Sequence, residues 1–379
     1  MMDALEFDKL IRGKNINFLI GSGASFPMYP TLSFGDDYPS FEEVVSNSGI
    51  STAAKIGMYI YYFINWIEPM GLGHEEFLKK YQDNDAIKNT IKNYGSFIKI
   101  LYNYLQCESN ELPKRINIFT TNYDLVFERT FDDFLKDNPL IYFNDGSRGV
   151  FKKYISNSNF YLNITHSGYN DNYKREVPTI NLFKLHGSLS WSIEQDKIIV
   201  EENNREITPI REFLKKIGIT LKKIENIVNK SKSRSIDNFV RQLNTEIRQL
   251  KLNKKQQNKF FLKYKNLLII NPDKYKFFAT VSEQHYYQLI RSFSYELERK
   301  QSVLIVFGFS FSDEHLKEIF ERSLLNPELQ VIIISYSQNE QRRIKTMFSG
   351  YKNIIFLPED NGKGNFLFLL SLLGETNEQ

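Results

Sequence analysis

Six short runs of apolar residues recur along the chain, and each run ends in small or polar residues. They are rich in Ile, Val and Phe and cover residues 15–23, 116–124, 181–188, 303–311, 331–337 and 353–360. Their apolar character is continuous rather than alternating, which is typical of strands buried on both faces of a parallel sheet. Ligand-binding groups gather at the carboxyl ends of such strands. The pattern therefore predicts a doubly wound α/β domain with a binding site along that edge of the sheet.

Helical periodicity fills two of the intervals between the apolar runs. Within 41–110 and 211–265, apolar positions recur at spacings of three and four, as in amphipathic helices. In residues 140–180, apolar and polar positions alternate more and turn residues occur, which favours a hairpin or an irregular β excursion. Because the apolar runs flank the helical segments, we expect a single domain over 1–379 with a helical insertion at 41–110 and a basic helical insertion at 190–265.

The positive charge is concentrated in one of these segments. Residues 211–265 hold 16 Lys or Arg and 4 Asp or Glu, a net charge of +12, whereas the whole chain carries +4. A solvated face on amphipathic helices is the usual reason for such a run, and we prefer it. Contact with the phosphates of a nucleic acid is the alternative.

Composition narrows the class of protein further. No stretch reaches the roughly 20 apolar residues of a membrane helix, so we expect no membrane partner. The first residues lack an apolar segment with a cleavage site, which favours a cytoplasmic location. Cys107 is the only cysteine, which excludes intrachain disulfides and a four-cysteine zinc site.

The first candidate site is the turn GSGAS, residues 21–25, which directly follows the first apolar run. Glycine allows a tight turn and lets backbone amides approach a pyrophosphate closely. The third glycine of the dinucleotide-binding fingerprint is absent. The turn alone therefore fits either a phosphate-binding loop or a plain connection between a strand and a loop.

Two more polar clusters end the second and third runs. TTNYD, residues 120–124, concentrates hydroxyl, amide and carboxylate groups, although its Asn or Asp could also cap the following helix. KLHGS, residues 184–188, contains His186. A histidine can act as a general base near neutral pH, so this cluster could supply one. A purely structural role for this histidine is the alternative.

A fourth cluster, GFSFSD, covers residues 308–313 and precedes a predicted helix. Ser310 or Ser312 could cap that helix, with Asp313 favourable in its first turn. The start of the helix also offers free amides to a phosphate or a ribose hydroxyl.

The order of these four clusters resembles that of the sirtuins. Sirtuins carry a Gly-Ala-Gly loop, a Thr-Gln-Asn-x-Asp motif, a His-Gly pair and a Gly-x-Ser motif in the same sequence. YPSFEEVV, residues 38–45, is similar to the Pro-x-Phe segment that follows their glycine loop. The resemblance covers about residues 15 to 337 with the insertions unmatched. It implies a Rossmann-like parallel sheet of the sirtuin type that binds NAD.

The resemblance also implies a role for each matching residue. The catalytic residues would be Asn122, which orders the ribose and a water, and His186, the general base at the ribose. Asp124 would hold the nicotinamide carboxamide, and Thr121 stands where sirtuins have glutamine. The other residues expected to bind NAD are Gly21, Ser22, Gly23, Ala24, Ser25, Gly308, Ser310 and Ser335.

The interval between the His-Gly and Gly-x-Ser motifs separates this chain from deacetylating sirtuins. Those enzymes carry a four-cysteine zinc module there, whereas residues 188–307 contain no cysteine. We therefore expect no metal and no groove for an acylated lysine. Water is then the simplest acceptor, and hydrolysis of NAD to ADP-ribose and nicotinamide the expected reaction.

A zinc-free core with two helical insertions looks like the sirtuin-like NADases of bacterial antiphage defence, above all the stand-alone subunit that partners a HerA-type ATPase. That resemblance implies NAD depletion during abortive infection, a homo-oligomer, and control by assembly with the ATPase. The alternative is a regulatory module that binds NAD or ADP-ribose without turnover and uses its basic helices to hold a partner or DNA.

Overall fold

The computed structural model of the chain divides into two compact units. It describes residues 2–30, 32–35, 37–108, 113–202, 205–271, 280–360 and 362–374. The sheet unit consists of residues 1–28, 83–186 and 283–379, and the helical unit of residues 29–82 and 187–282. The chain thus leaves the sheet unit twice, once after Met28 and once after His186.

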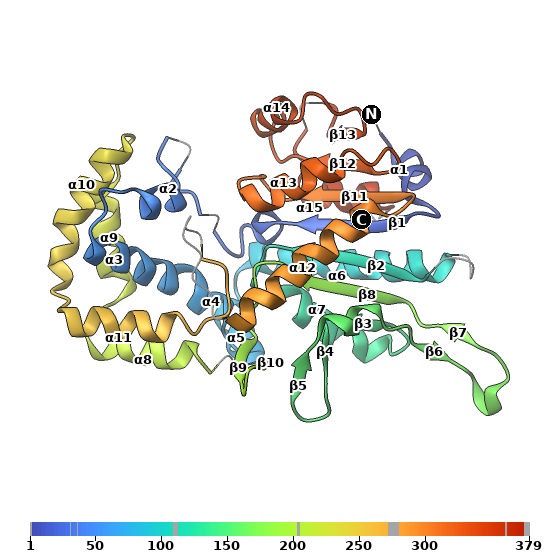
Figure 1. Cartoon of the computed structure of the whole chain (residues 1–379), viewed down its shortest axis with the longest axis horizontal. Coiled ribbons are helices and arrows are strands. Elements are labelled where there is room, and N and C mark those ends of the chain that lie inside the picture. The colour runs from blue at the N-terminus through green and yellow to red at the C-terminus, as the bar shows by residue number, and fades with distance from the viewer. Residues whose placement is uncertain are drawn as a thin grey trace. The chain divides into compact units, whose positions relative to one another are not determined.

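A seven-stranded parallel sheet forms the centre of the sheet unit (Figure 1). The spatial order is β13-β12-β11-β1-β2-β8-β3, and every neighbouring pair is parallel. The strands are β1 (Asn15–Ile20), β2 (Arg115–Thr120), β3 (Tyr142–Asn144), β8 (Thr179–Lys184), β11 (Ser302–Phe307), β12 (Gln330–Ile334) and β13 (Ile354–Leu357). All six predicted strands are confirmed, and the short β3 is an additional edge strand.

The strand order is that of the Rossmann fold. With β3 set aside, the strands numbered along the chain lie in the order 3-2-1-4-5-6. The direction of winding reverses between β1 and β11, which are neighbours in register from Asn15 to Ile20. Ligands of such sheets bind outside the carboxyl ends of the strands at this reversal. The turns that follow β1 and β11 therefore occupy the favoured position for a binding site.

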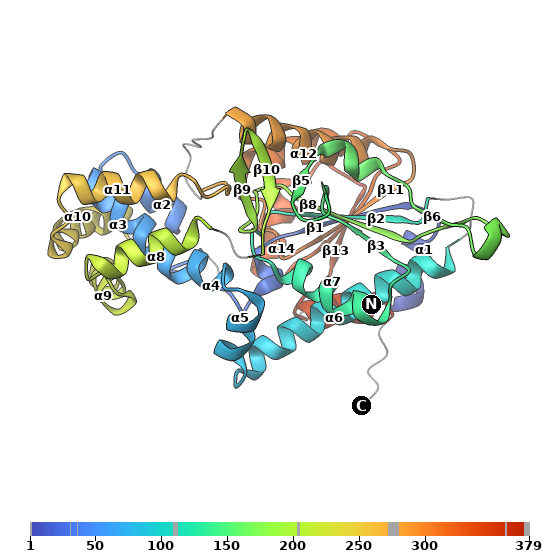
Figure 2. The same ribbon diagram turned by 90° about the horizontal axis from the view of Figure 1, so that it is seen from below.

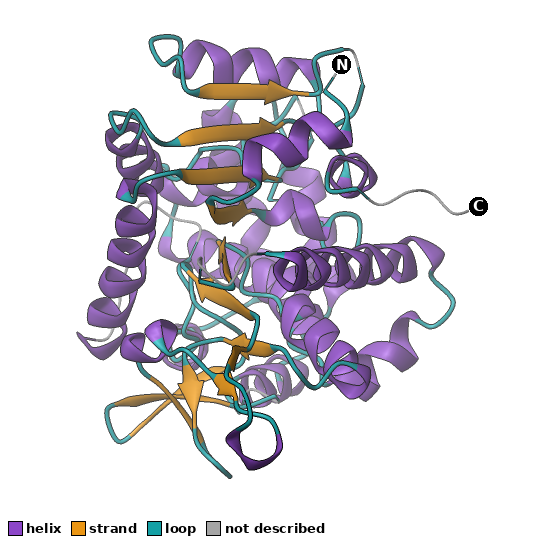
Figure 3. Ribbon diagram, turned by 90° about the vertical axis from the view of Figure 1, so that its right-hand side faces the viewer, coloured by secondary structure: helices purple, strands orange, loops and turns teal. Residues whose placement is uncertain are grey.

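Helices cover both faces of the sheet (Figures 2 and 3). On one face, Phe97 of α6 packs edge-on against Phe18 of β1, with ring centroids 5.0 Å apart. On the other face, Phe293 of α12 packs against Phe119 of β2 at the same separation. Burial on both faces explains why the apolar runs are continuous. The helices of this unit are α1 (Ala4–Ile11), α6 (Asp85–Cys107), α7 (Val126–Asp137), α12 (Thr280–Glu298), α13 (Glu314–Ser323), α14 (Gln338–Met347) and α15 (Phe366–Leu372).

The segment 140–180 forms the irregular β excursion that its alternation predicted. Beyond β3, it contains the antiparallel pairs β4 with β5 and β6 with β7. The short helices η3 (Asn157–Tyr161) and η4 (Tyr169–Asp171) separate these strands, which are β4 (Ser147–Arg148), β5 (Lys153–Ile155), β6 (Thr165–His166) and β7 (Arg175–Glu176).

The helical unit encloses an aromatic cluster. Phe34 packs against Phe41, Tyr61 and Phe239, and Trp66 against Tyr61 at a centroid separation of 5.3 Å. Its helices are α2 (Phe41–Ser46), α3 (Thr52–Tyr62), η2 (Phe63–Ile67), α4 (Glu68–Met70), α5 (His74–Tyr81), α8 (Ile207–Lys216), α9 (Leu221–Ser231), α10 (Ile236–Glu246), η5 (Ile247–Leu250) and α11 (Lys254–Tyr264). A hairpin joins β9 (Trp191–Glu194) to β10 (Lys197–Val200).

The basic segment 211–265 has the helical structure that its periodicity predicted. Apolar side chains such as Phe213, Ile224 and Phe239 are buried, whereas most of the Lys and Arg side chains are exposed. The charge therefore lies on the solvated faces of amphipathic helices, the interpretation preferred from the sequence.

One of the two expected insertions is shared between the two units, and the other lies within the helical unit. Residues 41–82 belong to the helical unit, but α6 belongs to the sheet unit, where it connects β1 to β2. The expected insertion at 41–110 is thus split, and its last two residues lie outside the described part of the chain. The segment 190–265 falls within the helical unit, with residues 203 and 204 outside the description.

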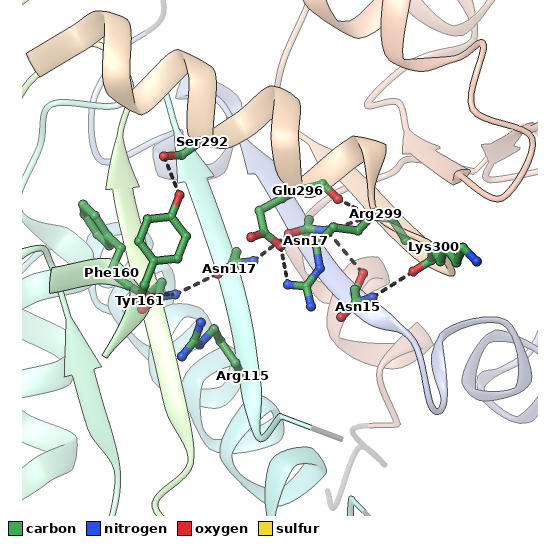
Figure 4. Close-up of polar contacts among 12 residues, drawn as sticks. Asn15, Asn17, Arg115, Asn117, Phe160, Tyr161, Ser292, Glu296, Arg299 and Lys300 are labelled. Atoms are coloured by element: carbon green, nitrogen blue, oxygen red, sulfur yellow. Dashed lines mark hydrogen bonds and ion pairs between the residues drawn. The ribbon is translucent and has the colours of Figure 1, made fainter. Parts of the chain in front are cut away.

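A ladder of buried asparagines crosses four neighbouring strands of the sheet, and Figure 4 shows part of it. Asn117 Nδ2 donates to Asn17 Oδ1 at 2.9 Å, Asn181 Nδ2 to Asn117 Oδ1 at 2.8 Å, and Asn144 Nδ2 to Asn181 Oδ1 at 2.9 Å. At one end, Asn17 Nδ2 donates to Ser302 Oγ at 3.0 Å. Buried amides are costly without partners, and the ladder supplies a partner to each of them.

Candidate functional site

The turns after β1 and β11 touch backbone to backbone at the reversal of winding. A Cβ atom on Gly21 would lie 2.3 Å from Gly308 O, and one on Gly23 would lie 2.9 Å from Gly308 Cα. On Gly308, whose φ is +65°, a Cβ would lie 2.5 Å from Ala24 N. The contact between the turns therefore requires glycine at all three positions, whatever else binds there.

Three amides of the glycine turn are used inside the protein. Gly21 N donates to Phe307 O at 3.0 Å, Gly23 N to Gly308 O at 3.0 Å, and Ala24 N to Gly21 O at 3.1 Å. The turn continues as the short helix η1 (Ser22–Ser25), in which Ser22 and Gly23 are exposed. These two residues form the outward surface of the turn.

Hydrogen bonds join the glycine turn to the TTNYD cluster. Ser25 Oγ donates to Asp124 Oδ2 at 2.9 Å, and Asn122 Nδ2 donates to Gly21 O at 3.1 Å and to Ser25 Oγ at 3.3 Å. Tyr94 of α6 also places its hydroxyl 2.9 Å from Ser25 Oγ. Ser25, Asn122 and Asp124 are buried. The structure thus brings together two clusters that the sequence presents about a hundred residues apart.

Asp124 also supports the start of α7. Its Oδ1 accepts a hydrogen bond from Val126 N at 3.1 Å, so both carboxylate oxygens have partners within the protein. The N-cap of α7 is Leu125, which makes no side-chain capping bond, so Asp124 closes the turn before the helix and does not cap it. Thr121 is half-buried, and its backbone amide donates to Ile20 O at 3.2 Å.

His186 forms an ion-pair contact with Asp313. Its Nε2 lies 3.1 Å from Asp313 Oδ2, and the two side chains are 17% and 15% exposed. An ionised carboxylate only accepts hydrogen bonds, so Nε2 carries the hydrogen in this contact. In the neutral ring, the lone pair then lies on Nδ1. The contact selects the tautomer that can accept a proton at Nδ1.

Asp313, not a serine, caps α13. Its Oδ1 accepts from Leu316 N at 3.0 Å. The expectation that Ser310 or Ser312 would cap this helix is wrong, because their hydroxyls instead lie 2.9 Å apart and bond to each other. The helix start therefore fixes the carboxylate that meets His186.

Ser310 and Ser335 lie beyond the ends of β11 and β12. The carbonyl of Ser310 accepts a hydrogen bond from the Arg343 guanidinium. Ser335 is 3% exposed, and its Oγ has no hydrogen-bond partner in the part of the chain that the structure describes. A buried hydroxyl without a partner costs roughly 1–3 kcal/mol, so this atom is a natural contact for a ligand.

The predicted site residues fall into two sets. A directly bonded set contains Ser25, Asn122 and Asp124, with the Gly21 and Gly308 turns packed against it. His186, Ser310 and Ser335 share the same edge of the sheet because they follow parallel strands, although β1 and β2 separate β8, which precedes His186, from β11 and β12. Within the described ranges, no hydrogen bond links these three residues to the first set.

Lys184 is a functional candidate that sequence reasoning missed. It is 2% exposed, and its Nζ lies 3.1 Å from Glu128 Oε1 and donates to the Asp124 carbonyl. Burial raises the pKa of Glu128, while the Lys184 charge acts in the opposite direction. Lys184 thus ties strand β8 to the loop that carries Asn122. Its signal was a lysine inside an otherwise apolar run.

Asp313 was missed as a histidine partner for a different reason. The sequence marks it only as an acidic residue before a helix, and nothing local relates it to His186. Tyr94 gave no signal at all, since an aromatic residue at helical spacing usually belongs to a core.

No protein-family model matches this sequence, and a search of curated proteins finds no match. No helix of the described ranges is long and apolar enough to cross a membrane. Conclusions about function therefore rest on the Rossmann-like sheet, the contacts at its carboxyl edge and the order of the motifs.

Proposed function

We propose that this chain is a sirtuin-like NAD⁺ glycohydrolase that releases nicotinamide and ADP-ribose. One observation carries the proposal. The glycine turn at the reversal of winding is hydrogen-bonded through Ser25 and Asn122 to the TTNYD cluster, on the edge where His186 follows the next strand.

Binding of the nucleotide would use the outward surface of the turns. Ser22 and Gly23 would meet the diphosphate, because they are the exposed residues of the turn. Gly308, Ser310 and the Ser335 hydroxyl would contact the adenosine end. The partnerless Ser335 Oγ supports this assignment.

The bond to be cleaved in NAD is the glycosidic bond between the ribose and nicotinamide, and nicotinamide is a good leaving group. Cleavage gives the ribose positive character, so catalysis requires groups that stabilise that charge and position a water. Asn122 Nδ2 is held by Gly21 and Ser25, which leaves Oδ1 to accept a hydrogen bond from the water or a ribose hydroxyl.

His186 would act as the general base. Its Nδ1 would take a proton from the attacking water or a ribose hydroxyl, and the Asp313 carboxylate would stabilise the cation so formed. Both carboxylate oxygens of Asp124 accept hydrogen bonds, from Ser25 and Val126. Asp124 would therefore hold in place the loop that contacts the nicotinamide.

The biological setting belongs to the same proposal and rests on the motif resemblance. The enzyme would act in the cytoplasm without a metal, as a homo-oligomer controlled by a HerA-type ATPase, and would deplete NAD in antiphage defence. A hydrolase of an essential nucleotide has to remain inactive until it is triggered, which is the reason to expect control by assembly.

A second candidate is a regulatory module that binds NAD or ADP-ribose without turnover. The observation that favours it is the engagement of both Asp124 oxygens and three turn amides within the protein. In this case the exposed basic side chains of 211–265 would hold a partner or nucleic acid. Phosphate contacts there would weaken steeply as salt increases.

The test is nicotinamide release by the purified protein, alone and with a cognate ATPase. We expect Asn122→Ala and His186→Ala each to lower release by roughly 10²–10⁴-fold, the range of general acid–base catalysis. His166→Ala is the matched control, because His166 is exposed on β6. Activity that survives both site substitutions would remove them from the mechanism, and tight NAD binding without product would favour the regulatory module.

A further inference from the structure

A cavity lies at the edge of the sheet opposite the candidate NAD site. Its volume is about 560 Å³, and its walls come from α1, α6, the end of α15 and the first residues of β1 and β2. Small-molecule sites usually measure roughly 300–1,000 Å³. We call this cavity the amino-edge pocket, because Ile16 and Ile116 lie where their strands begin.

The floor of the amino-edge pocket is apolar and buried. Phe7, Ile16, Phe18, Leu101 and Ile116 line it, and each is at most 3% exposed. The apolar surface open to a ligand comes from Leu5, Ile100 and Leu373, which also line the pocket, and an apolar body that covers them excludes water from both partners. It carries no group that would orient a polar ligand.

Polar groups lie at the rim, and their charges do not balance. Arg12 forms two hydrogen bonds with Asp8, at 2.7 Å from Nε and 3.0 Å from Nη2, so these charges neutralise each other. Glu108 accepts from Gly13 N at 3.4 Å and has no ion pair in the described ranges. The rim therefore presents one net negative charge, at Glu108.

The charge of Glu108 affects the neighbouring hydroxyl of Tyr104. Burial raises the pKa of Tyr104, and the Glu108 carboxylate raises it further. Tyr104 consequently stays a neutral phenol next to Glu108 and adds a polar group, without a second charge, beside the apolar floor.

We propose that the amino-edge pocket binds a small organic ammonium ion. The apolar body would lie against Leu5, Ile100 and Leu373, and the cationic head would meet Glu108. Carboxylates attract ammonium groups most strongly where water is partly excluded, as it is at this half-buried rim. The site is independent of the NAD site, and neither proposal requires the other.

Two fluorescent probes that share a dansyl body test the proposal. Dansylcadaverine carries an ammonium group, and dansylglycine a carboxylate. We expect saturable binding of dansylcadaverine, at least roughly tenfold tighter than that of dansylglycine, and a Glu108→Gln variant that weakens the ammonium probe by about tenfold. Glu318→Gln on α13 is the charge-matched control, because Glu318 is exposed and does not line the pocket.

The single cysteine provides a second measurement. Cys107 lines the pocket and is exposed, so bound dansylcadaverine should slow its modification by a maleimide. Ala4→Phe should narrow the pocket without removing a core side chain and should restore the original rate of modification. Absence of saturable binding, equal binding of the two probes, or binding unchanged in both Glu108→Gln and Ala4→Phe would overturn the proposal.

Discussion

Nε2 of His186 lies 3.1 Å from Oδ2 of Asp313, in a contact that joins the turn after β8 to the start of α13. The carboxylate is itself fixed by its bond to Leu316 N. One helix cap therefore determines which nitrogen of the candidate general base carries hydrogen. The two residues form a unit that can be tested separately from the rest of the site.

Asp313→Asn should lower kcat for nicotinamide release by roughly tenfold or more while KM stays the same. The amide can donate to Nε2, which would move the ring hydrogen to Nδ1 and leave Nδ1 without the lone pair that accepts the proton. Asparagine caps helices as well as aspartate does, so thermal unfolding should not change. Steady-state kinetics and a melting curve measure the two effects. A variant with normal kcat would show that the contact has no part in catalysis.

Gly308→Ala should destabilise the sheet unit more than the same substitution at another glycine with a positive φ. Its Cβ would lie 2.5 Å from Ala24 N, in addition to the cost of a positive φ. Gly374 is the control, because its φ is +94° and a Cβ there meets nothing within 4 Å. We expect roughly 1–2 kcal/mol for Gly374→Ala and at least 1–3 kcal/mol more for Gly308→Ala in urea unfolding. Equal losses would mean that the two turns can separate at no cost.

Lys184→Met should lower the free energy of unfolding by roughly 1–3 kcal/mol, because it leaves the half-buried Glu128 carboxylate and the Asp124 carbonyl without their partner. Replacing both partners, as in Lys184→Met with Glu128→Leu, should recover part of that loss. Urea unfolding of the wild type, both single variants and the double variant gives the coupling energy. If the double variant is as unstable as the sum of the singles, the pair has no specific interaction.

Acid should destabilise the protein partly through His285. Burial lowers the pKa of His285 from 6.5 to about 4 in the folded state. The unfolded chain therefore binds a proton first as pH falls, and stability is lost between about pH 6.5 and pH 4. Between about pH 7.5 and pH 4.5 we expect the drop in unfolding free energy to be roughly 2–3 kcal/mol smaller in His285→Gln than in the wild type.

The control for this titration is His166→Gln, since His166 is exposed. Its unfolding free energy should follow the pH dependence of the wild type. A His285→Gln variant with an unchanged pH dependence would show that this histidine is already protonated, or not buried, in the folded protein.

The sequence predicted the sheet well because strand burial is encoded locally. Six continuous apolar runs became six of the seven strands, and their placement at the centre of a doubly wound sheet follows from burial on both faces. The seventh strand, β3, is only three residues long and has no such run. Its pairing with β8 comes from tertiary contact alone.

Unit boundaries were harder to predict, because periodicity shows that a helix is amphipathic but not which core its apolar face meets. Residues 41–110 have one continuous helical character, yet Phe97 of α6 packs on Phe18 of the sheet while Phe41 packs in the helical unit. The contacts of His186 with Asp313 and of Lys184 with Asp124 are likewise long-range. No local pattern contains them.

The asparagine ladder has a consequence for how the site is assembled. Asn17, Asn117 and Asn181 each lie three residues before the end of their strand, so the hydrogen-bonded amides align the last residues of β1, β2 and β8. A strand that slid along its neighbours would set these amides against apolar side chains and lose their partners. The three strands therefore end level with one another, and the glycine turn, the Asn122 loop and His186 emerge at matching heights. A polar seam in the middle of the sheet sets the relative positions of groups that lie at its edge.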